Sequence, residues 1–174
     1  FVANSFGYPV FNADYEVSKI YQNNKKIFFK LKKKLPNYVK KFPLDKNEII
    51  QAILGNKNNL PKIINIVHRE IKIKLKLFLK KNKNKEIIIL DIPLLLENKI
   101  NSKNDVLIFV DAQKKDIKKR LIKRKNYNSR LLNKFKKIQL PLDYKKKKSH
   151  FIIKNKFTKT SIKNSVKKIL AEVL

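Results

Sequence analysis

EIIILD (86–91) and DVLIFVD (105–111) are two continuous runs of apolar residues that end in an aspartate. Strands of a parallel sheet are covered on both faces, and they typically consist of such uninterrupted runs of Ile, Leu, Val and Phe. A third run, PVFNAD (9–14), ends in the same way, and HFIIKN (150–155) is a shorter fourth run. Helical patterns separate the four runs. This alternation predicts an α/β fold with a mostly parallel sheet.

A long segment between the first two predicted strands, roughly residues 15–85, contains only helical patterns. Asp45 is predicted to cap one helix with Glu48 as its capping-box partner, and Gly55 is predicted to end that helix. The next predicted helix begins near Asn59 and has apolar residues at helical spacing. The segment is too long for a simple crossover between strands, so we expect a small helical subdomain.

The rest of the chain is also mainly helical in pattern. An amphipathic helix is predicted over 113–125 and a C-terminal helix over 158–174. Residues 126–148 are basic, with little apolar periodicity, and they predict a mobile flap. Residues 1–6 have the pattern of the inside of a helix, and Gly7 then predicts a turn.

The formal net charge is +31, from 44 Lys and Arg against 13 Asp and Glu. Such a charge is typical of nucleic-acid-binding proteins. However, lysine, asparagine and isoleucine share A/T-rich codons and make up roughly half of the chain, so we favour coding bias as the cause. There is no cysteine, which excludes disulfides and thiolate metal sites. No apolar run approaches the ~20 residues of a membrane span. We expect a cytoplasmic monomer with no membrane partner and no specific nucleic-acid partner.

Three aspartates are expected at the carboxyl ends of the predicted strands, where ligands bind to open parallel sheets: Asp14, Asp91 and Asp111. A carboxylate there can bind Mg²⁺ or accept a proton from a hydroxyl group. The alternative is that each aspartate only caps the helix or turn that follows it. Asp91 follows four apolar residues, which is typical of the carboxylate near the metal in phosphate-binding α/β proteins.

Two of the four arginines, Arg120 and Arg124, are four residues apart and are predicted to share one helix face. Guanidinium groups there suit phosphate oxygens, although a solvated helix face is equally compatible with the pattern. Phosphoryl transfer also needs a loop of backbone N–H groups around the phosphates. The chain has only two glycines, Gly7 and Gly55, and it contains no G-x-x-x-x-G-K-[ST] motif.

Four stretches together resemble the dephospho-CoA kinase family, in the family's order. They are VFNAD (10–14), IVHREIK (66–72), LDIPLLLENK (90–99), and VDAQKKDIKKRLIKR (110–124) continued by QLPLDYKKKKSHFIIKN (139–155). The resemblance implies a three-layer P-loop NTPase-like fold with a mostly parallel sheet. It also implies a single kinase-like domain over 1–174, with a helical CoA-binding insert over 15–85 and a basic lid over 126–148. In the family the P-loop directly precedes the position of Phe1, so the first strand and the P-loop are expected to be missing from these residues.

The activity that the resemblance implies is transfer of the ATP γ-phosphate to the 3′-hydroxyl of dephospho-CoA, with Mg²⁺. Asp14 matches the catalytic base, and Asp91 is the candidate Mg²⁺ ligand. The matching substrate-binding residues are His68, Lys72, Pro93, Leu94, Leu95 and Glu97. The matching ATP-binding residues are Arg120, Arg124 and Asn155. Residues 1–174 alone are expected to be inactive, because they contain no phosphate-binding loop.

Two other functions remain open from the sequence. One is a lysine-rich nucleic-acid binder, with Tyr127, Phe135 and Tyr144 available to stack on bases. The other is a different P-loop kinase that acts on a nucleoside or another small metabolite.

Overall fold

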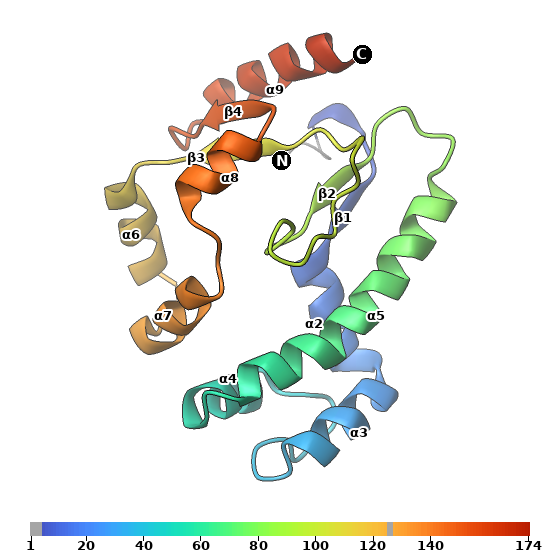
Figure 1. Cartoon of the computed structure of the whole chain (residues 1–174), viewed down its shortest axis with the longest axis vertical. Helices are drawn as coiled ribbons and strands as arrows, with labels where there is room; N and C mark the ends of the chain where they lie inside the picture. The colour runs from blue at the N-terminus through green and yellow to red at the C-terminus, as the bar shows by residue number, and fades with distance from the viewer. Residues whose placement is uncertain (1–4, 125–126) are drawn as a thin grey trace. The chain divides into compact units, whose positions relative to one another are not determined.

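The computed structural model describes residues 5–124 and 127–174. The chain divides into two compact units (Figure 1). The helical unit is Tyr8–Pro93. The basic unit is Leu94–Leu174 together with the described residues that precede Tyr8.

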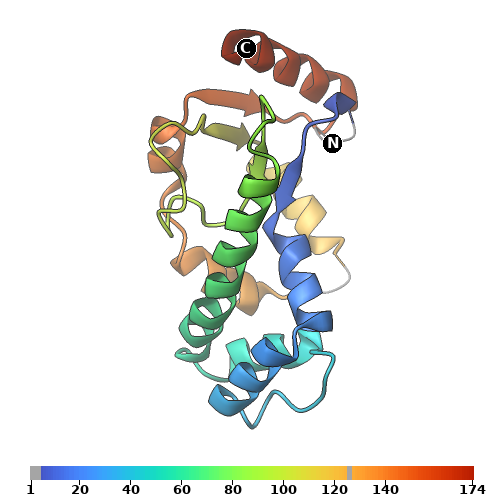
Figure 2. The same ribbon diagram turned by 90° about the vertical axis from the view of Figure 1, so that its right-hand side faces the viewer.

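The helical unit combines a two-stranded parallel sheet with four helices. Its strands are β1 (Val10–Asn12) and β2 (Ile89–Asp91), paired in a register that places Asn12 opposite Asp91. Its helices are α2 (Ala13–Asn23), α3 (Lys25–Lys34), α4 (Lys46–Gly55) and α5 (Asn59–Lys81). Figure 2 shows the long α5 from a second direction. The prediction of a helical segment between the first two strands is confirmed.

The core of the helical unit lies between α5 and the other helices. The most deeply buried large side chains are Ile20, Ile27, Leu31 and Val39. The apolar stripe predicted for the long helix faces them, and its buried members are Leu60, Ile63, Val67, Ile71 and Leu75. The 3.6-residue period of the sequence therefore identified the correct helix face.

The predictions for the ends of α4 are partly confirmed. Asp45 caps the helix, and its side chain accepts a hydrogen bond from the Asn47 N–H at 2.8 Å. The capping-box prediction for Glu48 is wrong, because its carboxylate accepts the Lys40 N–H instead. Gly55 is the last residue of α4, and a Cβ there would collide with the Tyr38 side chain. Close packing, rather than a left-handed backbone, is therefore the reason for a glycine at this position.

The basic unit contains a second two-stranded parallel sheet, formed by β3 (Ile108–Asp111) and β4 (Phe151–Lys154). Its helices are α6 (Lys114–Ile122), α7 (Ser129–Lys137), α8 (Leu142–Lys148) and α9 (Lys159–Val173). α9 packs on β4 and buries Ile153, Val166 and Ile169 (Figure 1). Phe6 packs against the same cluster, and Gly7 then turns with a left-handed φ of 72°.

Several boundaries differ from the sequence predictions. The structure has two helices, α7 and α8, in the described part of the predicted flap, and residue 126 of that flap lies outside the described residues. The helix predicted over 113–125 ends at Ile122, and residue 125 also lies outside the described residues. Residues 1–4 of the predicted N-terminal helix lie outside the described residues as well, and Ser5 and Phe6 are helical. Among the described residues, no helix is both long and apolar enough to cross a membrane.

Candidate functional site

The first candidate, Asp14, lies in the first turn of α2 and is exposed. The prediction that it ends a strand is wrong, because β1 stops at Asn12. The Asn12 side chain caps α2 by accepting the Tyr15 N–H at 2.8 Å, so the helix starts at Ala13, one residue before Asp14. Asp14 therefore lies at the positive end of the α2 dipole, where a carboxylate is favoured.

Asp91 ends β2, and its carboxylate contacts the start of α2. Asn12 Nδ2 donates to Asp91 Oδ2 at 2.7 Å, across the register pair of the β1–β2 sheet. This hydrogen bond orients the Asp91 carboxylate and leaves its other oxygen to accept a further donor. Within the described residues there is no cluster of three or more His, Asp or Glu that would hold a metal by itself. The structure thus brings Asp91 next to the turn that carries Asp14.

The predicted substrate-binding residues are divided between the two units. His68 and Lys72 are four residues apart on α5, so they share one face of that helix; His68 is half-buried and Lys72 is exposed. Pro93 is exposed at the end of the helical unit. The remaining members, Leu94, Leu95 and Glu97, belong to the basic unit.

The loop from Leu94 to Ile100 is compact and internally hydrogen-bonded. The side chain and the N–H of Asn98 both donate to the Leu94 carbonyl, at 2.9 and 3.1 Å. The Ile100 N–H donates to the Leu95 carbonyl at 3.1 Å. Leu94 and Lys99 have left-handed φ values of 59° and 49°, which cost energy in residues with a side chain. The hydrogen bonds of this loop hold it in a conformation that its residues would not adopt alone.

One oxygen of the Glu97 carboxylate has two partners within its own unit. Its Oε1 lies 2.5 Å from Lys145 Nζ and accepts the Leu140 N–H at 2.9 Å. Burial raises the pKa of Glu97, but the hydrogen bonds from Lys145 and from the Leu140 N–H outweigh burial, so the pKa is lowered overall. Glu97 is therefore ionised and paired.

The prediction that the two arginines share one helix face is wrong. Arg120 lies on α6, with its guanidinium 4.2 Å from the centre of the Phe157 ring. Arg124 does not share a helix face with Arg120, because α6 ends at Ile122. Asn155 follows β4, and its side chain accepts the Phe157 N–H at 2.7 Å. Arg120 and Asn155 thus both contact Phe157.

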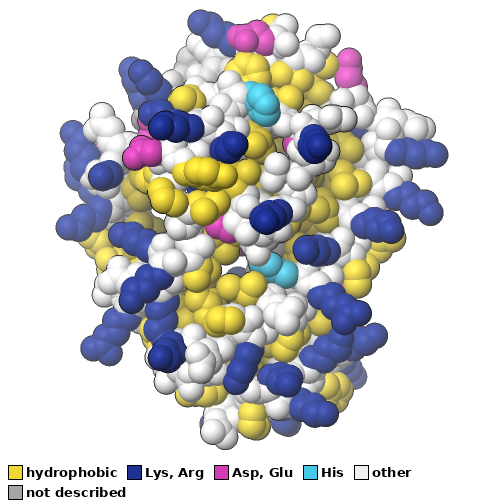
Figure 3. All heavy atoms as spheres, viewed as in Figure 1, with side chains coloured by type: hydrophobic (Ala, Val, Ile, Leu, Met, Phe, Trp, Pro, Cys, Tyr) yellow, Lys and Arg dark blue, Asp and Glu magenta, His cyan; other side chains and the backbone are white. Residues whose placement is uncertain are grey.

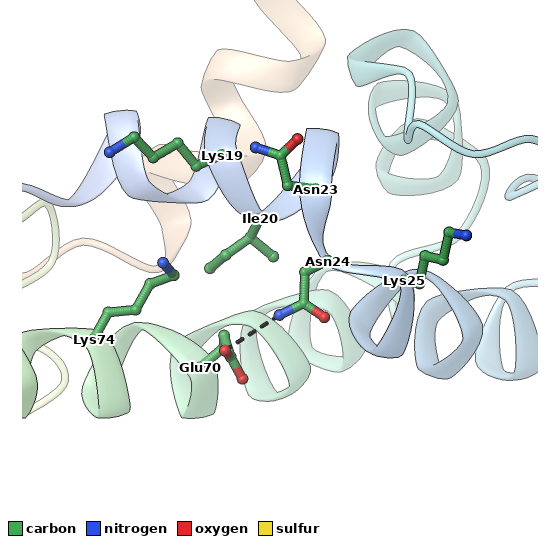
Figure 4. Close-up of a pocket in the computed structure, with 7 residues that line it drawn as sticks. All are labelled: Lys19, Ile20, Asn23, Asn24, Lys25, Glu70 and Lys74. Atoms are coloured by element: carbon green, nitrogen blue, oxygen red, sulfur yellow. Dashed lines mark hydrogen bonds between the residues drawn. The ribbon is translucent and has the colours of Figure 1, made fainter.

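A pocket of ≈ 320 Å³ in the helical unit contains none of these candidates (Figure 4). Its lining residues are Lys19, Ile20, Asn23, Asn24, Lys25, Glu70 and Lys74. Glu16 lies within 3.3 Å of Lys19 and 3.1 Å of Lys74 and partly neutralises both. In Figure 4 the Lys25 side chain points away from those two lysines. Glu16 already pairs with two of the ammonium groups and the third points away from them, so this pocket is not the candidate site.

Comparison with known proteins adds the decisive observation. The family model for dephospho-CoA kinase matches residues 1–161. The chain belongs to the dephospho-CoA kinase family. The dephospho-CoA kinase of Wolbachia pipientis wMel is 32% identical to it over 175 residues, which cover 98% of this chain and 89% of the relative. That of Bartonella quintana is 27% identical, over 84% of this chain and 76% of the relative.

Solved structures show the same fold. A crystal structure of a Thermus thermophilus protein matches with a TM-score of 0.73 at 23% identity, over 99% of this chain and 88% of that one. The dephospho-CoA kinase from Campylobacter jejuni matches with a TM-score of 0.58 at 25% identity and the same coverage. The prediction of an α/β, P-loop NTPase-like kinase is thereby confirmed.

The sequence did not predict three residues that contact the candidate site residues. Asn12 orients Asp91, Lys145 pairs with Glu97, and Phe157 contacts Arg120. Asn12 carries a local signal, since an asparagine between an apolar run and a helix is a typical cap. Lys145 lies in a run of four lysines that gives no reason to select one of them. Phe157 has no signal at the level of the sequence.

Proposed function

We propose that this chain transfers the γ-phosphate of ATP to the 3′-hydroxyl of dephospho-CoA and so forms coenzyme A. The observation that carries the proposal is the family match over residues 1–161, which includes the contact between the end of β2 and the start of α2. Asp91 is at that contact, and Asp14 lies two residues beyond Asn12, in the first turn of α2. Two carboxylates at the carboxyl end of a parallel sheet suit phosphoryl transfer.

Asp14 is the proposed general base, which accepts the proton of the attacking 3′-hydroxyl or orients that hydroxyl. Its exposed position leaves it accessible to substrate. Asp91 is the proposed Mg²⁺ ligand. Its residue type fits, because Mg²⁺ is usually bound by one or two carboxylates together with substrate phosphates, and Asn12 orients this one. A bound Mg²⁺ would neutralise charge on the phosphates of ATP.

Contacts to the substrates are proposed for the other residues that match the family. Arg120, Arg124 and Asn155 would bind ATP. His68, Lys72, Pro93, Leu94 and Leu95 would bind dephospho-CoA. We place the reaction in the cytoplasm and expect a monomeric enzyme that is not specific for nucleic acid. The comparisons do not favour the alternative of a nucleic-acid-binding protein.

Phosphoryl transfer also needs a loop of backbone N–H groups around the phosphates of ATP. Neither Gly7 nor Gly55 lies in a glycine-rich loop between a strand and a helix. In the described residues each sheet has two strands, so β2 and β3 each have one unpaired edge. β3 also exposes Ile108 and Val110, which is unusual for a parallel strand. These features support a further strand at an open edge of one of the sheets.

The test compares residues 1–174 with an extended chain that includes the residues encoded upstream of Phe1. Each is assayed for ATP- and Mg²⁺-dependent phosphorylation of dephospho-CoA and of a panel of nucleoside monophosphates. We expect the extended chain to phosphorylate dephospho-CoA and residues 1–174 to be inactive. Phosphorylation of a nucleoside monophosphate but not of dephospho-CoA would refute the proposed substrate. Turnover by residues 1–174 alone would refute the expectation that these residues cannot bind the phosphates of ATP without a glycine-rich loop.

A further inference from the structure

The short helix α8 is held in the basic unit by two neighbouring lysines that contact different segments. Lys145 Nζ lies 2.5 Å from Glu97 Oε1, in the loop that follows Pro93. Lys146 Nζ lies 3.3 Å from Asp111 Oδ2, at the end of β3. The N–H of Leu140, just before α8, donates to the same Glu97 oxygen at 2.9 Å. Glu97 therefore contacts α8 and also the residues that lead into it.

The two ion pairs differ in strength because they differ in exposure. The side chains of Glu97 and Lys145 are 10% and 19% exposed, whereas those of Asp111 and Lys146 are 39% and 45% exposed. Exposed pairs contribute little, since water and salt screen them. The Glu97 pair is shielded, and a backbone N–H bond adds to it. Glu97 is therefore the main attachment point of α8.

The loop that carries Glu97 is suited to fix a helix. Asn98 donates twice to the Leu94 carbonyl and holds the loop in its left-handed turns at Leu94 and Lys99. A carboxylate on such a constrained loop has little freedom to follow a moving helix. The position of α8 is consequently set by the loop, through Glu97.

Glu97 is poorly suited to bind the substrates directly. ATP and dephospho-CoA carry several negative phosphate charges, and a carboxylate repels them. The Glu97 carboxylate already has two donors on one oxygen, and its side chain is mostly buried. Lys147 and Lys148, in contrast, lie exposed on the same helix. A fixed α8 would present these lysines to a phosphate group.

We infer that Glu97 is a positioning residue that holds α8 so that its exposed lysines can contact substrate phosphates. This inference rests on the proposed function, and it replaces the prediction that Glu97 itself binds substrate. Glu97 acts through Lys145 and the Leu140 N–H and has no contact with the reacting atoms.

Two variants test the pairing in the 174-residue chain, where no activity is needed. Glu97→Gln keeps an oxygen for the Leu140 N–H but removes the charge that binds Lys145. Lys145→Met removes the ammonium group and keeps most of the aliphatic stem. We expect amide hydrogen exchange of 140–148 to be faster by about tenfold in each variant, with no further increase in the double variant. Glu172→Gln, on the exposed side of α9, is the matched control and should leave this exchange unchanged.

The same variants are then measured in the extended chain. We expect both variants to raise the KM for ATP or for dephospho-CoA, the two phosphate-bearing substrates, by about tenfold. They should change kcat less, because substrate binding rather than the chemical step is affected. Unchanged exchange in Glu97→Gln would overturn the inference. A rise in KM in Glu97→Gln but not in Lys145→Met would also overturn it, since Glu97 would then act on substrate directly. An inactive parent enzyme would refute the proposed function, whereas the exchange result would still decide whether Glu97 holds α8.

Discussion

Asp14→Asn tests whether the Asp14 carboxylate acts in catalysis or supports the fold. The substitution keeps the size of the side chain and removes one negative charge from the first turn of α2. The helix keeps its cap from Asn12 and a second acidic residue, Glu16, in the same turn. The expected loss of stability is therefore only that of one exposed charge near a helix N-terminus, about 0.3–1 kcal/mol.

The expected effect on catalysis is much larger. A general base contributes about 10²–10⁴-fold in rate, which corresponds to roughly 3–5 kcal/mol of transition-state stabilisation. Asp14→Asn in the extended chain should lower kcat by that factor at saturating dephospho-CoA and ATP. Urea denaturation of the same protein should show a midpoint close to that of the parent, with an unchanged slope.

Asp116→Asn is the matched control for this experiment. Asp116 lies in the first turn of α6, so its substitution makes the same change in charge at another helix N-terminus. Its kcat should stay within about twofold of the parent, because Asp116 has no proposed role in catalysis or substrate binding and substitutions away from such sites usually have small effects. A kcat for Asp14→Asn within about tenfold of the parent would refute the role as base. A stability loss above about 2 kcal/mol would instead show that Asp14 supports the fold.

Three further predictions concern the helical unit. Leu31→Ala empties a site that is 0% exposed and should lower the free energy of unfolding by about 2–5 kcal/mol in urea. Burial raises the pKa of Tyr21 to about 12. Because the Tyr21 hydroxyl ionises at lower pH in the unfolded chain, the free energy of unfolding should fall by roughly 2–3 kcal/mol as the pH rises from about 10 to 12. Tyr21→Phe should lack this fall. Gly55→Ala should destabilise by about 1–2 kcal/mol through its collision with Tyr38, but in a Tyr38→Ala background it should stabilise by up to about 1 kcal/mol; a loss of similar size in both backgrounds would contradict the packing argument.

The sequence was most informative where burial is periodic. The apolar runs identified all four described strands, and the helical spacing on α5 identified its buried face. Both signals follow from the hydrophobic effect, which acts on many residues at once and survives local exceptions. The helices α7 and α8 were not predicted. They have only nine and seven residues, and four of the seven residues of α8 are lysines.

Element ends were less predictable, because single side chains decide them. Asn12 ends β1 by capping α2, and this moves Asp14 from a strand end into a helix. α6 stops at Ile122, which separates Arg124 from the face of Arg120. In each case the residue composition allows a longer element. The boundary depends on local hydrogen bonds that compete with continuation.

The contacts around the candidate site could not be read from one sequence. Asn12 and Asp91 are 79 positions apart, and Leu140 and Glu97 are 43 positions apart. Periodicity reports whether a residue faces the core, but it does not report which distant residue it meets. The resemblance to the family indicated the position of Glu97 and assigned it to substrate. Only the geometry shows that its carboxylate is already paired with Lys145.

The acidic residues carry more information about this protein than the basic ones. With 44 basic and 13 acidic residues, a lysine near any given point is expected from composition alone, whereas a carboxylate is scarce. Each carboxylate ion-paired in the described residues joins separate segments of one unit: Glu16 joins α2 to α5, while Glu97 and Asp111 each join another segment to α8. Removing one lysine leaves many others to bind a phosphate, but removing one of these carboxylates leaves its lysine without that partner. Substitutions of Glu16, Glu97 and Asp111 should therefore perturb the fold or its catalysis more than substitutions of most lysines, although lysines outnumber them.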